Sequence, residues 1–427
     1  MTFSLFEEHF MDLIPIIQRM RTPGMKVNVP LAAKQHEILR RALLQLEAYW
    51  AKMFPSIDYS SNIQLRNYFY KVKKIPEITE RRGKDGKRTA TVNEDALNII
   101  ATKYGVESAR LVILMRKIKD ASEFFTRFNS EGWARPTWKI HGQANGRLQA
   151  KDPNVNNIPE EMLKSDNFDG VHPREVYIPD TEEDTFLYFD FEQIEHWLTC
   201  WYAGDTDYLR MKEEGIYIHG VNLEEIFKIP FFQPGMPKVK KYRLPSVKPQ
   251  DLLRAKAVRH GFNNGRGWKS LADECNKSGI PMSYEEAREY QNRDRRTHPA
   301  IYEFHEKVVG TALRQGFLQN AFGRIRPFSG TERTDIVAFM QQSTAADVLI
   351  RNALRGLSPT LWEFGPRCRI IFSGHDSCLI NVPKKHKDEI ARFVRQKTTE
   401  PIPQLNGFRM DIELFEGPNW YDLSLME

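Results

Sequence analysis

The chain has 427 residues, of which 41% are hydrophobic and 11% aromatic, enough apolar material for two or three packed units. Its 62 Lys and Arg against 56 Asp and Glu give a net charge of only +6, so charge neither requires nor excludes nucleic-acid binding. The four cysteines form no CxxC pair and no zinc-type spacing, so neither a disulfide framework nor a structural zinc site is indicated, and no apolar run approaches the ~18 residues of a membrane span. We expect a soluble protein of a reducing, cytoplasmic setting, neither secreted nor bound in a membrane.

Residues 31–54 contain the first strong periodic pattern. Leu39, Leu43, Leu46 and Trp50 recur at spacings of three and four, with charged residues between them. Such a pattern places the apolar side chains on one face of an amphipathic helix. A long helical arm is therefore predicted here.

The segment 71–90 is strongly basic, holds two glycines and lacks apolar periodicity. These features predict a solvated loop or the tip of a hairpin. A run of positive charge is usually only a solvated surface, which is the interpretation we favour; contact with a phosphate backbone is the alternative.

Around residue 186 the pattern changes to FLYFD, a short apolar run typical of a buried strand. Ile194, Trp197 and Leu198 then follow at helical spacing. The local prediction is strand, turn and helix, with Asp190 at the end of the strand.

Two later segments predict a loop and a hairpin. Residues 231–250 contain four prolines and five Lys or Arg, so an irregular loop is expected before the next helix. RIIF and CLINV flank SGHDS, which predicts a hairpin with His375 and Asp376 at its turn.

Five motifs occur in a fixed order: NGRLQAKDPNVNNIP (145–159), FDFEQIE (189–195), AKAVRHGFNNGRG (255–267), QSTAADVL (342–349) and GHDSCLINVP (374–383). They resemble the primer-contact motif, motif A, the nucleotide-binding helix, a QGTAADII segment and motif C of the family A DNA polymerases, the bacterial DNA polymerase I class. A single Asp at a strand end or in a turn is usually structural. Five ordered matches over nearly the whole chain outweigh that interpretation.

The resemblance implies an α+β fold with the right-hand architecture of polymerases, in which an antiparallel palm sheet lies between helical fingers and a helical thumb. We expect the thumb and its connection to the palm in residues 1–130, the palm in 131–205 and 346–427, and the fingers in 206–345. The implied activity is template-directed addition of dNTPs to a primer 3′ end.

The implied partners are primer-template DNA and dNTPs. Because the chain starts where the thumb of the family starts, we expect it to lack a proofreading exonuclease domain. A separate exonuclease or replication accessory proteins are then candidate partners. The small size fits a phage-encoded enzyme.

The metal site implied by the resemblance uses the carboxylates of Asp190 and Asp376 and the backbone carbonyl of Phe191. Two Mg²⁺ ions, for which Mn²⁺ can substitute, would activate the primer hydroxyl and neutralise charge on the leaving pyrophosphate. Mg²⁺ typically takes one or two carboxylates together with phosphate and water oxygens. The two aspartates are distant in sequence, so one sheet must bring them together.

Leu252, Lys256, His260 and Asn264 recur every four residues and therefore share one face of the predicted helix. The resemblance implies that Lys256 meets the triphosphate and protonates the pyrophosphate, and that His260 stacks on the sugar and base. The family has Arg at the position of Leu252. We expect Arg259, three residues beyond Lys256, to replace that charge.

Further implied contacts involve the incoming nucleotide and the duplex. Gln193, Glu195 and His219 are assigned to the nucleotide, with Glu195 as the steric gate against a 2′-hydroxyl. The alternatives are a first-turn Glu favoured by the helix dipole and a structural His. The duplex contacts, which check base-pair shape more than sequence, are Arg147, Asn154, Asn157, Asn264, Gly265, Gln342 and His375.

Three departures from the family pattern keep two rivals open. Leu252, Asn264 and Ser377 stand where the family usually has Arg, Tyr and Glu, and Ser377 removes a third carboxylate, which we expect to modulate activity. One rival is a catalytically inactive DNA-binding or scaffold protein. The other is a single-subunit RNA polymerase, against which Glu195 argues.

Overall fold

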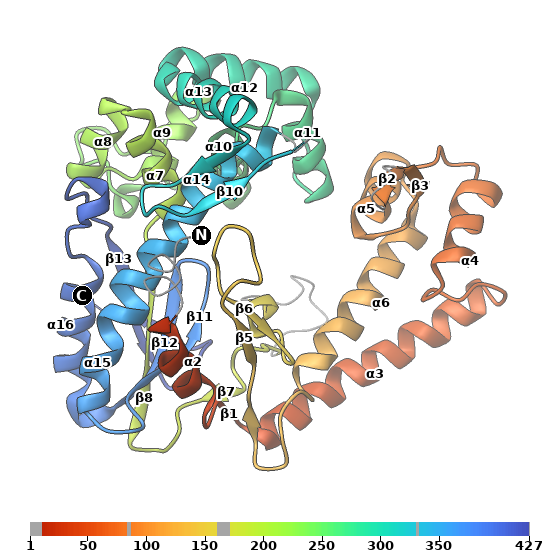
Figure 1. Cartoon of the computed structure of the whole chain (residues 1–427). Coiled ribbons are helices and arrows are strands. Elements are labelled where there is room, and N and C mark those ends of the chain that lie inside the picture. Colours follow the sequence, from red (N-terminus) through yellow and green to blue (C-terminus); the bar gives the residue numbers. More distant parts are fainter. Residues whose placement is uncertain (1–10, 83–86, 160–170, 330–332, 427) are drawn as a thin grey trace.

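A five-stranded antiparallel sheet in the order β11-β12-β8-β13-β14 is the centre of the computed structural model, which describes residues 11–82, 87–159, 171–329 and 333–426 (Figure 1). The strands are β8 (Asp184–Phe191), β11 (Arg369–Ser373), β12 (Ser377–Pro383), β13 (Ile412–Gly417) and β14 (Ser424–Leu425). β8 is the middle strand, and its four companions come from the C-terminal part of the chain. The predicted palm sheet, shared between two distant segments, is confirmed.

β11 and β12 are apolar runs rather than alternating patterns, whereas β13 mixes buried and partly buried residues and β14 is exposed. Every residue of β11 and β12 is buried, as expected for strands covered on both faces. The helices packed against them are α2 (Leu13–Arg21), α15 (Gly356–Glu363) and α16 (Lys387–Thr398). Short helical turns complete the palm: η6 (Leu349–Arg355), η7 (Lys384–His386) and η8 (Pro403–Leu405).

Two small sheets connect the palm to the rest of the chain. β1 (Met25–Val27) pairs with β4 (Trp133–Ala134) and with β7 (Tyr177–Ile178). β5 (Thr137–Lys139) pairs with β6 (Gln149–Lys151), and η3 (Val155–Asn157) follows. The segment that carries the predicted primer-contact motif is thus a short hairpin and turn beside the palm.

The thumb is a long helical arm. α3 (Val29–Met53) runs beside α6 (Glu107–Phe124), and the arm ends in a second apolar core of its own. That end holds α4 (Asn62–Arg66), η2 (Asn67–Val72), β2 (Thr79–Arg82), β3 (Lys87–Ala90) and α5 (Glu94–Lys103). The predicted helix over 31–54 is confirmed. The basic segment forms the β2–β3 hairpin, whose tip at 83–86 lies outside the described residues.

The fingers are helical and lie above the palm in Figure 1. In chain order they are α7 (Ile194–Ala203), α8 (Thr206–Glu213), α9 (Ile218–Asn222), η4 (Leu223–Phe227), η5 (Lys240–Tyr242), α10 (Pro249–Asn263), α11 (Trp268–Lys277), α12 (Tyr284–Thr297), α13 (Pro299–Gln315), β9 (Phe317–Gln319), β10 (Ile325–Pro327) and α14 (Arg333–Val348). The loop predicted over 231–250 is irregular apart from η5 and an isolated bridge. The predicted boundary at residue 345 falls inside α14, so fingers and palm share that helix.

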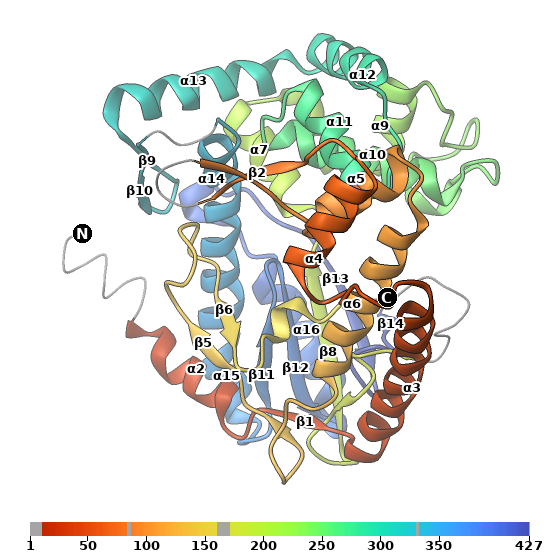
Figure 2. The same cartoon turned by 90° about the vertical axis from the view of Figure 1, so that its right-hand side faces the viewer.

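The end of the thumb reaches the fingers. Asn98 on α5 donates a hydrogen bond from Nδ2 to the backbone oxygen of Lys277 at 3.0 Å, and the Lys277 ammonium lies 3.5 Å from the carboxylate of Asp95. α5 also packs against α11, and these two helices lie next to each other in Figure 2. Thumb, palm and fingers therefore form a continuous ring of contacts.

Two expectations from composition can be compared with the described residues. All four cysteines are unpaired and buried. None of the helices in the described ranges combines the length and the apolar character that a bilayer span requires.

Candidate active site

The sheet register brings the two predicted metal-binding aspartates to one end of the palm. Asp190 on β8 lies opposite Ser377 on β12, so Asp376 immediately precedes its partner. The backbone N–H of Phe191 donates to the backbone oxygen of Asp376 at 2.9 Å. His375 and Asp376 occupy the turn between β11 and β12, as predicted. Two residues far apart in sequence thus stand on adjacent, hydrogen-bonded strands.

A third strand adds a carboxylate that the motifs did not indicate. Glu413 on β13 is the register partner of Asp190 on the side away from Ser377. Ser377 provides no carboxylate on β12, but Glu413 provides one on β13, the other neighbour of β8. The available sequence signal was the pair of acidic residues Asp411 and Glu413, which flank Ile412 where β13 begins.

Asp190 opens onto a cleft of roughly 390 Å³ between the palm and the fingers. Its charged residues are of both signs: four carboxylates, three lysines and one histidine. They are Asp190, Glu192, Asp411, Glu413, Lys212, Lys240, Lys256 and His219. Lys212 is already paired with Asp411, with Nζ 2.5 Å from the carboxylate oxygen.

The oxygen donors at this end of the sheet fit a hard divalent cation. Among the described residues no group of three or more His, Cys, Asp or Glu is assembled as a metal cage. A pair of aspartates is nevertheless the usual protein contribution to Mg²⁺, because phosphate and water oxygens complete its shell. Removal from solvent raises the pKa of Asp376 to about 6, against the lowering effect of the nearby Arg147 guanidinium. The donor set suits ions that arrive with their substrate.

The fingers contribute the cationic part of the cleft. Lys256 on α10 is exposed and makes no ion pair with any described residue. Nδ1 of His219 on α9 is buried, and no described residue offers it a hydrogen bond. Burial, and then the charges of Lys256, Arg259 and Lys240, lower the pKa of His219 to about 3. His219 is therefore a neutral imidazole at pH 7, with an unused polar atom beside two lysines.

The start of α7 holds Gln193 and Glu195 at the edge of the same region. Gln193, which lines the cleft, adopts a left-handed backbone conformation with φ 50°, an uncommon state for a residue with a side chain. Glu195 forms an ion pair with Arg147, and its Oε2 lies 3.9 Å from Nδ1 of His260. The structure brings together Arg147, Glu195 and His260 from three separate motifs.

Arg259 does not face the cleft, which contradicts its predicted role. Its side chain is 1% exposed and forms an ion pair with Asp294, which is fully buried on α12. The guanidinium also lies 5.4 Å from the ring centroid of Tyr208. Side chains three residues apart on a helix point about 60° away from each other. Arg259 is therefore turned away from the direction of Lys256 and points into the core of the fingers. Its charge still acts on His219, but its guanidinium is engaged by Asp294 and does not line the cleft in place of the Arg missing at Leu252.

The primer-contact segment adjoins the motif C turn through a residue that was not predicted. Asn156 donates from Nδ2 to the backbone oxygen of Ser373 at 2.9 Å and accepts from the N–H of Ala150 at 2.7 Å. Asn145 donates to Gln342 on α14 at 3.3 Å. These bonds hold the segment against both the palm turn and the fingers helix.

The predicted duplex contacts differ in exposure. His375 and Asn157 are exposed, whereas Asn154 is partly buried, and its Oδ1 finds no hydrogen-bond partner among the described residues. Gln342 and Arg147 are also partly buried and already bonded within the protein. All five lie in the primer-contact segment, the motif C turn or α14, which meet beside Asp376. Their contacts with DNA stay predictions.

Asn264 and Gly265 have a visible structural role at the end of α10. Asn264 donates to the backbone oxygen of His260 at 2.9 Å and accepts from Nε2 of Gln341 at 3.0 Å. Gly265 has φ +69°, and a Cβ atom there would stand 3.1 Å from Val337 on α14. Both residues dock α10 onto α14, and a contact with the templating base stays a prediction.

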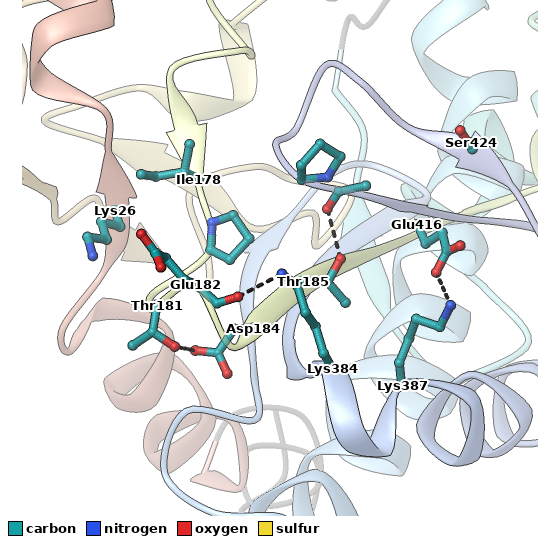
Figure 3. Close-up of a pocket in the computed structure, with 13 residues that line it drawn as sticks. Lys26, Ile178, Thr181, Glu182, Asp184, Thr185, Lys384, Lys387, Glu416 and Ser424 are labelled. Carbon is teal, nitrogen blue, oxygen red and sulfur yellow. Dashed lines mark hydrogen bonds and ion pairs between the residues drawn. The ribbon is translucent and has the colours of Figure 1, made fainter.

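A larger hollow, of about 840 Å³, lies at the opposite end of β8, where Asp184 begins the strand (Figure 3). Its lysines are already engaged. Lys26 donates to the backbone oxygen of Asp180 at 2.6 Å, Lys384 to that of Glu182 at 2.7 Å, and Lys387 is paired with Glu416. Size alone therefore does not identify the chemical site.

An antiparallel sheet with paired aspartates at one end, enclosed by helical fingers and a helical thumb, defines the class of right-hand polymerase domains. Residues 30–422 match the model of DNA polymerase family A. The chain belongs to that family, and the predicted family and fold are confirmed.

Relatives cover nearly all of the chain at low identity. It is 24% identical to DNA polymerase I of Caldicellulosiruptor bescii, over 98% of this chain and 47% of that protein. It is 24% identical to the thermostable DNA polymerase I of Thermus aquaticus, over 97% and 48% respectively. The chain thus spans about half the length of these relatives.

A solved structure shows the same fold. The POL domain of Pol1 from M. smegmatis, in complex with DNA primer-template and dNTP, superimposes with a TM-score of 0.78. The match covers 98% of this chain and 71% of that chain, at 19% sequence identity.

Proposed function

We propose that this chain is a template-directed DNA polymerase that adds dNTPs to the 3′ end of a primer. The observation that carries the proposal is the cleft in which Asp190, beside the Asp376 turn, shares one hollow with Lys256 and with His219, whose Nδ1 has no hydrogen-bond partner among the described residues. Membership of DNA polymerase family A supports it, as does the likeness to a POL domain solved with DNA primer-template and dNTP.

The metal ions are the finer part of the proposal. Asp190, Asp376 and the backbone carbonyl of Phe191 would hold two Mg²⁺ ions, which Mn²⁺ can replace. When bound, such ions lower the pKa of the attacking hydroxyl and neutralise charge on the transferring phosphate. The protein's task is to fix two carboxylates on neighbouring strands, where the Phe191–Asp376 backbone bond sets their separation.

The triphosphate is bound by side chains of the fingers. Lys256 is a mobile point charge facing the cleft, suited to phosphate oxygens and to donating a proton to the leaving pyrophosphate. His219, neutral at pH 7, offers a ring nitrogen rather than a charge. Gln193, whose Oε1 is buried without a described partner, lies at the mouth of α7 where the nucleotide would enter.

Sugar selection would depend on Glu195. The ion pair with Arg147 and the nearby ring of His260 hold the carboxylate in one place. A fixed carboxylate against the C2′ position would collide with a 2′-hydroxyl, which favours dNTPs over rNTPs. The RNA polymerase alternative is therefore not proposed, and no observation favours an inactive scaffold.

The partners we propose are dNTPs and primer-template DNA, the latter contacted by Arg147, Asn154, Asn157, Gln342 and His375. A separate exonuclease and replication accessory proteins stay candidate partners. Contacts from the primer-contact segment and the motif C turn would place the primer terminus beside Asp376, because Asn156 joins these two segments.

The test is primer extension by Asp190→Asn and Asp376→Asn. Each change keeps the size of the side chain and removes its charge, so we expect extension to fall by ~10³-fold or more, about 4 kcal/mol of barrier. Affinity for primer-template, measured by fluorescence anisotropy, should change by less than threefold. Asp388→Asn, at an exposed position of α16, is the matched control and should extend normally.

Metal dependence is tested with the same wild-type protein. Chelation should stop extension, and Mg²⁺ or Mn²⁺ should restore it. Near-normal extension by either aspartate variant would refute the site. Absence of extension by the wild type, with tight binding of DNA, would instead support the scaffold alternative.

A further inference from the structure

The cleft beside Asp190 contains a lysine that none of the five motifs includes. Lys240 belongs to η5, within the Pro- and Lys-rich loop between the helices α9 and α10. It lines the same hollow of roughly 390 Å³ as Asp190 and Lys256. Its charge therefore enters the cleft from a different element than that of Lys256.

The loop that carries Lys240 is fastened at its base. Phe231 and Phe232 are buried, and the N–H groups of both donate to Oε1 of Glu224, at 3.1 and 3.2 Å. The N–H of Leu244 donates to the oxygen of Phe231 at 2.7 Å and closes the loop. A basic loop held in this way keeps its side chains over one place.

A further bond ties the loop to the cleft itself. The N–H of Tyr217, which lines the cleft, donates to the backbone oxygen of Lys238 at 2.8 Å. Lys240 is two residues further on. The backbone that carries Lys240 is thus anchored beside the cleft by a main-chain contact.

Three neighbouring lysines of the loop, Lys238, Lys240 and Lys241, differ in what they contact. Lys238 lies 3.7 Å from Glu224, and Lys241 lies over the ring of Tyr242 at 6.0 Å. Lys240 is exposed, and its ammonium makes no ion pair or hydrogen bond with any described residue. Burial is the largest cause of the lowered pKa of His219, followed by the charges of Lys256, Arg259 and Lys240. The contribution of Lys240 places its ammonium near that imidazole.

We propose that Lys240 binds the triphosphate of the incoming nucleotide together with Lys256 and His219. This inference rests on the proposed polymerase function. Three donors from three elements converge on one small hollow, which suits a compact polyanion. A duplex backbone would instead be met by a row of donors along an extended surface. Leu252, one turn before Lys256, supplies no charge, and the third lysine of the cleft, Lys212, is already paired with Asp411, so Lys240 is the second lysine of the cleft without an ion pair to a described residue.

The proposal is tested with Lys240→Ala, with Lys240→Arg as rescue and Lys241→Ala as the matched control. Losing one charge-assisted hydrogen bond costs ~1.5–3 kcal/mol, or about a 10- to 100-fold change. We expect Lys240→Ala to raise KM for dNTP by that factor while kcat changes less than threefold. Lys240→Arg should recover most of the loss, and Lys241→Ala should resemble wild type.

Binding is measured separately from turnover. With a dideoxy-terminated primer, the Kd for the matched dNTP should rise 10- to 100-fold in Lys240→Ala only. Affinity for primer-template and its dependence on salt should not change, because a lost DNA phosphate contact would reduce the slope of log K against log salt by ~0.9. A reduced slope, with unchanged dNTP affinity, would overturn the proposal in favour of DNA contact.

Inorganic tripolyphosphate separates this proposal from the proposed function. If the wild type fails to extend primers, the polymerase assignment falls, but weaker tripolyphosphate binding by Lys240→Ala would still support an anion site at Lys240. The proposal for Lys240 is overturned if Lys240→Ala binds tripolyphosphate as tightly as Lys241→Ala does, and also binds dNTP as tightly. Thermal unfolding midpoints should agree among the variants, because both lysines are exposed.

Discussion

The buried pair between Arg259 and Asp294 should be a major source of stability in the fingers. Their side chains are 1% and 0% exposed. The Asp294 carboxylate also accepts a hydrogen bond from the Tyr302 hydroxyl at 2.7 Å. Nε and Nη1 of Arg259 are buried without a described partner, so the guanidinium depends on Asp294 for its compensation.

Asp294→Asn therefore leaves an uncompensated guanidinium inside the protein. Breaking a buried pair by removing one partner costs ~3–5 kcal/mol, a large part of the ~5–15 kcal/mol by which a domain is stable. For a cooperative unit of 150–250 residues this corresponds to a fall in Tm of ~6–20 °C. Arg259→Met should cost a similar amount, because the Asp294 carboxylate then stays buried with only the Tyr302 hydroxyl as a side-chain partner.

The double variant Arg259→Met, Asp294→Asn tests whether the cost comes from the unpaired charge. It removes both charges, so it should be less destabilised than the sum of the single variants by at least ~2 kcal/mol. Urea unfolding followed by tryptophan fluorescence and thermal unfolding by circular dichroism give the free energies. The argument is refuted if each single variant costs less than ~1 kcal/mol and the two costs add in the double variant. A tenfold rise in KM for dNTP in Arg259→Met without loss of Tm would restore the triphosphate role.

Two other predictions concern sugar choice and pH. Glu195→Ala should lose some dNTP efficiency, because Arg147 loses its partner. It should also reduce discrimination against rNTPs by about a hundredfold, on the order of 3 kcal/mol. An unchanged ratio of kcat/KM for dNTP and rNTP would place the gate elsewhere. Burial opposes the charging of His298, but its hydrogen bonds to Asp205 and Glu225, both at 3.2 Å, raise its pKa overall. The resulting stabilisation is complete below the unfolded pKa of ~6.5 and is lost as pH rises through the higher folded pKa. The difference in unfolding free energy between wild type and His298→Asn should therefore shrink from pH 6 upward, and a constant difference would contradict this.

Local patterns predicted the elements that carry the aspartates. FLYFD is β8, the SGHDS turn is the β11–β12 connection, and the periodic segment 31–54 is α3. In each case the apolar pattern and the turn residues alone decide the structure, since the strands are buried on both faces and the helix is amphipathic. The two carboxylates could be assigned because each lies at the end of such a pattern.

Residues positioned by register or rotation could not be predicted in this way. Glu413 meets Asp190 only because β13 pairs with β8 in one register, and a shift by one residue would turn its side chain to the other face. Arg259 was misassigned because spacing gives its angle to Lys256 but not which side of α10 faces the core. The contact between Asp95 and Lys277 depends on the placement of the whole thumb arm.

The charge distribution of the cleft is incomplete without its proposed ligands. Four carboxylates line it, and one of them, Asp411, is paired with Lys212. Divalent ions would compensate the aspartate end, and a triphosphate would compensate Lys240 and Lys256, so each ligand makes the other's binding more favourable. The cleft then has no deficit of positive charge at Leu252, because Lys240 in the loop supplies the cation that α10 lacks. A comparison confined to the residues of α10 would count this site as one cation short, and the chemistry depends on the fold that brings Lys240 to it.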